Sequence, residues 1–169
     1  MDVVEATRTR AGGRAKTARG AWVALTLSGA ATFWAANLLI SLTPAAAAYR
    51  SAQSIDYVPM LVEAAAGGLV LAGLFSLIML RWGARLPGSG RLCHALFLAI
   101  CALVLVTAFV EVPAKLGAGG DDPGRWLLVA TVINTIRIVA LGLTIGLVGR
   151  VRDDAADSDS PRATGEDTP

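Results

Sequence analysis

The residues best suited to chemistry are polar side chains inside long apolar segments, and the most unusual of them is Arg137. It lies near the centre of an apolar segment, at about 126–149, that is long enough to cross a bilayer as a helix. An arginine at that depth costs about 2.5–3.5 kcal/mol on insertion scales, so its side chain should face protein or water rather than lipid. We therefore expect the other segments to supply partners for Arg137.

Four further polar side chains are expected in the same half of the membrane. They are Asn37, Glu63, Glu111 and Asn134. At a rise of 1.5 Å per residue, Asn37 and Glu63 should lie about 9 Å below the outer boundary, Asn134 about 12 Å and Arg137 about 16 Å. Because side chains lean toward the N-terminus of their own helix, these groups can converge on one level. We predict that Arg137 pairs with Glu63 and that the two asparagines complete the hydrogen bonds. Glu111 is the alternative partner.

Two interpretations of this polar cluster remain open. A buried ion pair with amide groups can fix the register of the helices without binding anything. Alternatively, the cluster opens to the outer side, where Arg137 could hold an anionic headgroup or a small acid. In that case Glu63 and Glu111 could also pass a proton.

The sequence gives little support for catalysis or for a cofactor. Its only histidine, His94, and its two cysteines, Cys93 and Cys101, fall short of a metal ligand set. There is no P-loop, no HExxH motif and no GxSxG motif. We expect no metal, no cofactor and no nucleic-acid partner, and enzymatic activity is left open but not favoured.

Four apolar segments must position these residues in a chain of 169 residues that is 54% hydrophobic. The segments cover about 20–43, 57–80, 92–112 and 126–149 and make up a transmembrane domain at 20–150. Short connections favour antiparallel neighbours, so the fold class expected is all-α: an integral membrane four-helix bundle, up-down-up-down. Pro44 and Pro113 should end the first and third segments, and Asp122 followed by Pro123 should open the fourth.

The positive charges indicate how the bundle is oriented. They gather in the leader at 1–19, in the second connection at Arg81, Arg85 and Arg91, and after the last segment at Arg150 and Arg152. The positive-inside rule then places both termini in the cytoplasm and the connections at 44–56 and 113–125 outside. The leader and the tail at 151–169 are polar and are expected to be disordered. The Ala-, Gly- and Arg-rich composition suggests the inner (plasma) membrane of a bacterium.

The first apolar segment permits a second interpretation. A basic stretch, an apolar stretch and the alanines at 45–48 also resemble a secretory signal with its cleavage site. The apolar stretch is about 22 residues long, whereas the core of a signal has about 7–15. Cleavage stays an alternative, and it would leave three spans with the same orientation.

Small residues at intervals of four are expected to hold the helices together, because association in lipid depends on close packing and polar contacts. These stripes are Ala24, Ser28, Thr32 and Ala36 on the first segment, Ala64, Gly68, Ala72 and Ser76 on the second, and Gly142 with Gly146 on the fourth. Whether each stripe packs within one copy or between copies is left open.

These features define a kind of protein rather than an activity. We expect a small multi-pass membrane protein that serves as a non-catalytic accessory or interaction subunit, in contact with the bilayer and with a membrane-protein partner or a second copy. The alternative is a small transport or proton-coupled protein that uses the polar cluster.

Overall fold

The computed structural model describes residues 3–117 and 122–158, with side chains for 18–117 and 122–155, and every regular element within these ranges is helical. The elements are α1 (Val3–Ser41), α2 (Pro44–Ala52), α3 (Tyr57–Trp82), η1 (Gly83–Arg85), α4 (Arg91–Val106), η2 (Thr107–Glu111), α5 (Val112–Gly117) and α6 (Pro123–Ser158). Four stretches are long and apolar enough to cross a membrane: Ala18–Ser41, Tyr57–Arg85, Arg91–Gly117 and Pro123–Ala155. The all-helical class and the four apolar segments expected from the sequence are confirmed.

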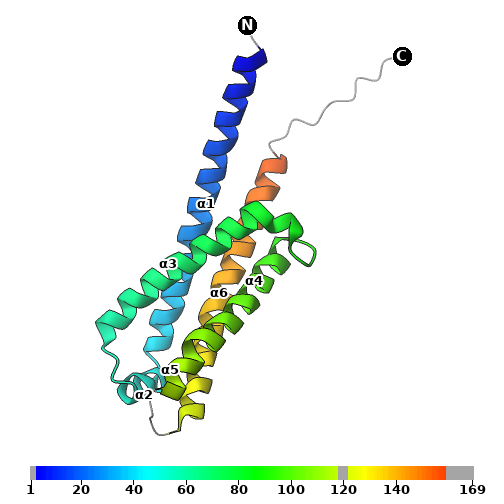
Figure 1. Ribbon diagram of the computed structural model, residues 1–169. Helices are drawn as coiled ribbons and strands as arrows, with labels where there is room; N and C mark the ends of the chain where they lie inside the picture. The colour runs from blue at the N-terminus through cyan, green and yellow to red at the C-terminus, as the bar shows by residue number, and fades with distance from the viewer. Residues whose placement is uncertain (1–2, 118–121, 159–169) are drawn as a thin grey trace.

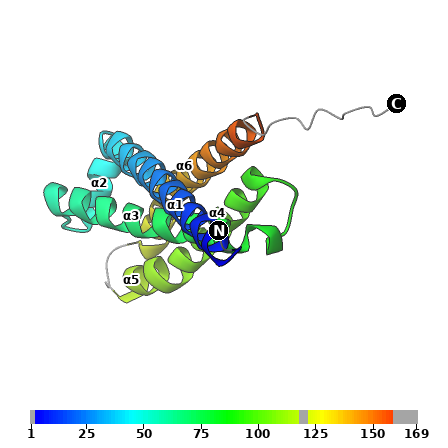
Figure 2. The same ribbon diagram turned by 90° about the horizontal axis from the view of Figure 1, so that it is seen from above.

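Helices α1 and α6 form the centre of the molecule. Helix α3 packs against α1 and α4 packs against α6, while α3 and α4 touch each other much less (Figures 1 and 2). Figure 1 shows α3 crossing α1 at a steep angle. The order of packing is therefore α3, α1, α6, α4, so the first and last long helices of the chain share the central interface.

Contacts along α1 show that it runs antiparallel to both of its partners. A Cβ built on Gly29 would lie close to Ile145 of α6 and to Ala72 of α3. Further along α1, Phe33 lies against Gly68. Residue numbers rise along α1 while they fall along α3, as short connections between neighbouring helices require.

The small residues of α3 and α6 lie at helix contacts within this chain. Ala64, Gly68, Ala72 and Ser76 are all buried. On α6, a Cβ added at Gly142 would lie 3.0 Å from Cβ of Ala99, and one added at Gly146 would lie 3.0 Å from Cα of Leu92. The Gly142–Gly146 face is therefore used by α4 and is not a free surface.

On α1 the buried stripe is shifted by one position along the sequence from the predicted stripe. Ala24, Ser28, Thr32 and Ala36 are only half-buried, and the buried positions are Leu25, Thr26, Gly29, Phe33, Asn37 and Ser41. The cause is that a large residue of α1 packs against a small residue of α3: the ring of Phe33 occupies the space left open by Gly68. The pattern of small residues on α1 does not reveal that the space for close packing is instead provided by a glycine of α3.

The connection expected after Pro44 contains a further helix, α2, which the sequence analysis did not predict. Thr43 is its N-cap and accepts a hydrogen bond from the Ala46 amide at 3.3 Å, and Pro44 takes the first helical position. The proline thus ends α1 and also starts α2. This helix lies across the end of the molecule where α1 ends and α6 begins, which we call the α2 end.

Pro113 does not end the third span, contrary to expectation. A π-helical turn, η2, precedes it, and the helix continues as α5. Proline lacks an amide hydrogen and clashes with the carbonyl four residues earlier, and an extra residue in the turn relieves that clash. The insertion also shifts the register of Glu111, the last residue of η2, by about 100°.

Helix also extends into both flanking segments, which were expected to be disordered. Helix α1 begins at Val3, and α6 continues to Ser158. Alanine, arginine and lysine in the leader are good helix formers, so a membrane helix can propagate into it. Residues 1–2 and 159–169 lie outside the described part of the chain.

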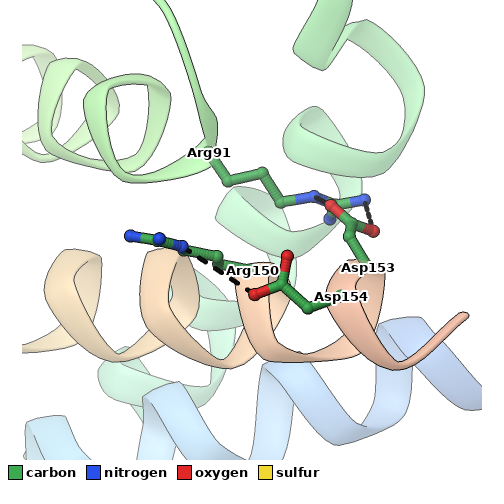
Figure 3. A network of polar contacts seen from close by, with 4 residues as sticks. All are labelled: Arg91, Arg150, Asp153 and Asp154. Carbon is green, nitrogen blue, oxygen red and sulfur yellow. Dashed lines mark hydrogen bonds and ion pairs between the residues drawn. The ribbon is translucent and has the colours of Figure 1, made fainter. Parts of the chain in front are cut away.

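At the end opposite α2, one ion pair links the start of α4 to the end of α6, and a second lies within α6 (Figure 3). Arg91 pairs with Asp153, donating from Nη2 to Oδ1 at 2.7 Å, and Arg150 lies 3.9 Å from Asp154. The Arg91 and Asp153 side chains are 32% and 50% exposed. Such exposed ion pairs contribute little to the free energy of folding, because water screens the attraction between the charges.

We expect Asp153→Asn to lower the free energy of unfolding by less than about 1 kcal/mol, because the lost ion pair is solvent-exposed. Unfolding in detergent at low ionic strength should reveal the loss, and about 1 M salt should remove most of the difference from the wild type. A loss that persists unchanged at high salt would contradict a screened, exposed pair.

Candidate functional site

A cavity of about 220 Å³ lies at the α2 end of the molecule. Its wall is formed by residues of α1, α2, α3, η2 and α6 and of the α2–α3 connection. Its charged and amide lining consists of Asn37, Arg50, Glu63, Glu111 and Arg137. Four of the five residues of the predicted polar cluster therefore line one cavity, and the fifth, Asn134, bonds to two of them.

Arg137 is the centre of a hydrogen-bond network that joins three helical elements. Its Nη1 donates to Oδ1 of Asn37 at 2.7 Å, and its Nη2 donates to Oδ1 of Asn134. Nδ2 of Asn134 donates in turn to Oε1 of Glu111 at 2.8 Å. The guanidinium also lies over the ring of Phe33, 5.3 Å from its centroid. One asparagine thus connects the positive charge of Arg137 to the negative charge of Glu111.

The ion pair predicted between Arg137 and Glu63 is not present. Glu63 is exposed on α3, one position before the buried Ala64, and makes no ion pair with another described residue. The reason is the rotation of α3, which turns its small-residue stripe toward α1 and leaves Glu63 at the edge of that contact. Glu63 still lines the same cavity as Arg137.

Two hydrogen-bond donors in this network are buried without an acceptor among the described residues. They are Nδ2 of Asn37 and Nε of Arg137. The orientation of the Asn37 amide is fixed, because its oxygen already accepts from Arg137. Buried donors without partners cost about 1–3 kcal/mol each, so the network has capacity for an acceptor that the described residues do not supply.

Helix α2 is held over the cavity by contacts with cations. Nζ of Lys115 donates to Oε1 of Gln53 at 3.0 Å and lies 4.7 Å from the ring centroid of Tyr49. Arg50 donates from Nη1 to the carbonyl of Ser41 at 2.9 Å. Its guanidinium also lies 5.0 Å from the ring centroid of Tyr57. Lys115 is only 8% exposed, so its ammonium group is committed to this contact.

Tyr49, Arg50 and Lys115 were not predicted as site residues. A signal for α2 was present. Thr43-Pro44 before a run of alanines has the N-cap and first-turn residues of a helix start. Had that helix been predicted, Tyr49 and Arg50 would have been placed near the outer end of the bundle.

We expect Lys115→Met to loosen α2, because the hydrogen bond to Gln53 and the cation–π contact with Tyr49 are lost together. Hydrogen exchange of the α2 amides should become about 5–30 times faster, which corresponds to about 1–2 kcal/mol. Leu116→Ala is the matched control, since Leu116 is its exposed neighbour on α5. Equal exchange rates in the two variants would show that Lys115 does not hold α2.

Other candidate residues lie apart from this cavity. His94 places Nε2 3.0 Å from the Gly88 carbonyl oxygen, Cys93 is exposed and Cys101 is half-buried. No group of three or more histidine, cysteine or acidic residues that could hold a metal occurs in the part of the chain that the structure describes. A larger cavity of about 460 Å³ lies between α1 and α3, but residues such as Trp22 and Leu74 make its lining almost entirely apolar.

Comparisons with known proteins add no constraint. No protein-family model, curated protein or solved structure matches this chain.

Proposed function

We propose that this chain is an up-down-up-down, four-span protein of a bacterial inner (plasma) membrane that binds a small ligand with an acidic oxygen group in the cavity around Arg137. The α2 end faces outward, and the ends of α1 and α6 away from it lie on the cytoplasmic side. The four apolar helices and the clustering of Arg81, Arg85, Arg91 and Arg150 at the opposite end support this arrangement. The ligand would enter from the outer side.

One observation carries the binding proposal. Arg137 lines a cavity within the span, yet no carboxylate of the described residues contacts it directly, and its Nε and the nearby Asn37 Nδ2 have no acceptor among those residues. A network that only fixed helix register would be expected to use all of its buried donors. An anionic oxygen atom would complete both the charge and the hydrogen bonding.

The same network favours retention of the first span. Asn37 of α1 accepts a hydrogen bond from Arg137, and Phe33 covers the guanidinium. Cleavage at 45–48 would remove both contacts and leave Arg137 open on one side. We therefore propose that α1 stays in the mature protein.

Ligand binding is tested by the thermal midpoint of the purified protein in detergent with added acetate, propanoate or phosphate at constant ionic strength. At least one of these anions should raise the midpoint, because a ligand that binds only the folded state stabilises it. Ile133→Phe, which places a larger side chain in the cavity wall, should abolish the shift. The control Ile136→Phe changes an exposed position of the same helix and should keep it. No shift with any of the three anions would contradict an anion-binding cavity.

Orientation is tested with the native thiol at the end opposite α2. Cys93 is exposed near the start of α4, so a membrane-impermeant maleimide should label it in inverted vesicles and not in intact spheroplasts. A Cys93→Ala variant identifies the labelled site, because Cys101 is half-buried within the span. Labelling of intact spheroplasts would reverse the proposed orientation.

The second candidate function is a non-catalytic accessory or interaction subunit. The observation that favours it is the apolar groove of about 210 Å³ between α3 and α4, which Phe75 and Leu98 help to line. Because α4 occupies the Gly142–Gly146 face, a partner would have to use another surface. Native mass spectrometry after gentle extraction would show a stable complex with another protein if this role is correct, and a bare monomer would argue against it.

A further inference from the structure

We infer that the ligand of this cavity is a zwitterion, a small molecule that carries both an anionic oxygen group and an ammonium group. A free α-amino acid and the headgroup of phosphatidylethanolamine share this chemistry. The inference rests on the proposed function and specifies the class of ligand. Its starting point is the lining, which contains two guanidinium groups, Arg50 and Arg137, and two carboxylates, Glu63 and Glu111.

These four charged side chains form no ion pair with one another. The ion pairs in the described ranges join Arg91 with Asp153 and Arg150 with Asp154, all at the opposite end of the molecule. A carboxylate and a guanidinium that line one cavity within a membrane span, without contact between them, each raise the free energy of the folded state. A ligand that carries both signs can satisfy both groups and adds no net charge to the site.

The anionic end of the ligand would bind at Arg137. Nε of Arg137 and Nδ2 of Asn37 are buried donors that find no acceptor in the described part of the chain, and Asn37 is only 4% exposed. Arg50 already donates from Nη1 to the Ser41 carbonyl, so its guanidinium has fewer hydrogen-bond donors left for a ligand. Carboxylate and phosphate oxygens accept several hydrogen bonds at once, which suits two donors on adjacent helices.

The ammonium end would bind at Glu63. Oε1 of Glu111 already accepts a hydrogen bond from Asn134, whereas Glu63 has no ion-pair partner among the described residues. Glu63 is also more accessible than Glu111, so an entering ligand reaches it first. Drug-sized ligands occupy pockets of about 300–1,000 Å³. A cavity of about 220 Å³ therefore suits a molecule with few heavy atoms, or a headgroup alone.

The experiment compares L-alanine with two fragments of it, propanoate and ethylamine, by titration calorimetry on the full chain in detergent. L-alanine should bind at least about tenfold more tightly than either fragment, because each fragment loses one charge-assisted contact. O-phosphoethanolamine, and phosphatidylethanolamine retained in native mass spectra from mixed phosphatidylethanolamine and phosphatidylglycerol nanodiscs, test the lipid source. Binding of L-alanine alone identifies a free amino acid, and binding of the phosphoethanolamine probes identifies a headgroup.

Several outcomes would overturn the zwitterion. If propanoate binds as tightly as L-alanine, the anion site of the proposed function remains and the ammonium site does not exist. If neither L-alanine nor O-phosphoethanolamine binds and phosphatidylethanolamine is not retained, the zwitterion is ruled out. If acetate, propanoate and phosphate also fail to bind, the proposed function is lost with it.

A pair of variants locates the ammonium site. Glu63→Gln should weaken the binding of the best zwitterionic probe at least about tenfold and should not weaken propanoate binding, because it removes a negative charge from the cavity. Glu63 is exposed and outside the Arg137 network, so this variant should keep its fold, which its thermal midpoint will report. Asp56→Asn is the matched control, because Asp56 is an exposed acid before α3 that makes no capping hydrogen bond with its side chain. Unchanged zwitterion binding in Glu63→Gln would overturn the assignment.

Discussion

Replacing Arg137 with methionine lowers the free energy of unfolding by about 2–4 kcal/mol, as we expect from the hydrogen bonds that it removes. The amide oxygens of Asn37 and Asn134 both accept from this guanidinium, and both residues are buried. Methionine fills similar space but donates nothing, so two buried acceptors are left unpaired. Reversible unfolding of the purified protein in mixed micelles measures the loss.

A double-mutant cycle separates the partners of Arg137. Combining Arg137→Met with Asn37→Leu should show a coupling energy of about 1.5–3 kcal/mol, because the two residues share a charge-assisted hydrogen bond. Combining Arg137→Met with Glu63→Gln should be additive within about 0.5 kcal/mol. Strong coupling to Glu63 and none to Asn37 would show that the ion pair expected from the sequence forms after all.

Enlarging Gly142 is the second change with a large expected effect. A Cβ at Gly142 would lie 3.0 Å from Cβ of Ala99 and 3.1 Å from the carbonyl oxygen of Ala95, and that backbone atom cannot move aside as a flexible side chain can. Gly142→Leu should therefore push α4 away from α6 and lower the free energy of unfolding by about 2–3 kcal/mol.

Gly67→Leu provides the matched control for that prediction. Gly67 lies within a span, on α3, but a Cβ built there meets nothing within 4 Å. Its replacement should be neutral or slightly stabilising, since glycine is the poorer helix former. Equal losses at Gly67 and Gly142 would mean that helix propensity, rather than contact between α4 and α6, determines the result. Thermal midpoints in one detergent are sufficient to compare the two.

The proximity of Asn37 and Arg137 could be predicted from the sequence, whereas the absence of a pair between Arg137 and Glu63 could not. Rise per residue and the lean of side chains are local properties, and they predicted that Asn37 and Arg137 would be close together in space. The choice between Glu63 and an amide depends on how far α3 rotates about its axis. That rotation is determined by Phe33 packing onto Gly68, a contact between two helices that neither sequence segment reveals alone.

Prolines caused the other differences between expectation and structure. Pro44 and Pro113 were both interpreted as ends of spans, which is the usual effect of proline on a helix. At Pro44 the chain starts a new helix, α2, and at Pro113 the π-helical turn η2 lets the helix continue. The start of α2 is determined locally, because Thr43 caps the helix that Pro44 opens. Of the site residues on these two elements, Glu111 was predicted as part of the polar cluster, whereas Tyr49 and Arg50 were missed.

The contact between Asn37 and Arg137 also bears on the order of biosynthesis. The two residues are 100 positions apart, in the first and last spans to leave the ribosome. At about 5–20 residues per second, Asn37 waits about 5–20 s for its partner to be made. During that interval the Asn37 amide lacks the Arg137 partner that it has in the folded chain. Closure of the central interface between α1 and α6 is therefore a late step, because it needs the last long helix.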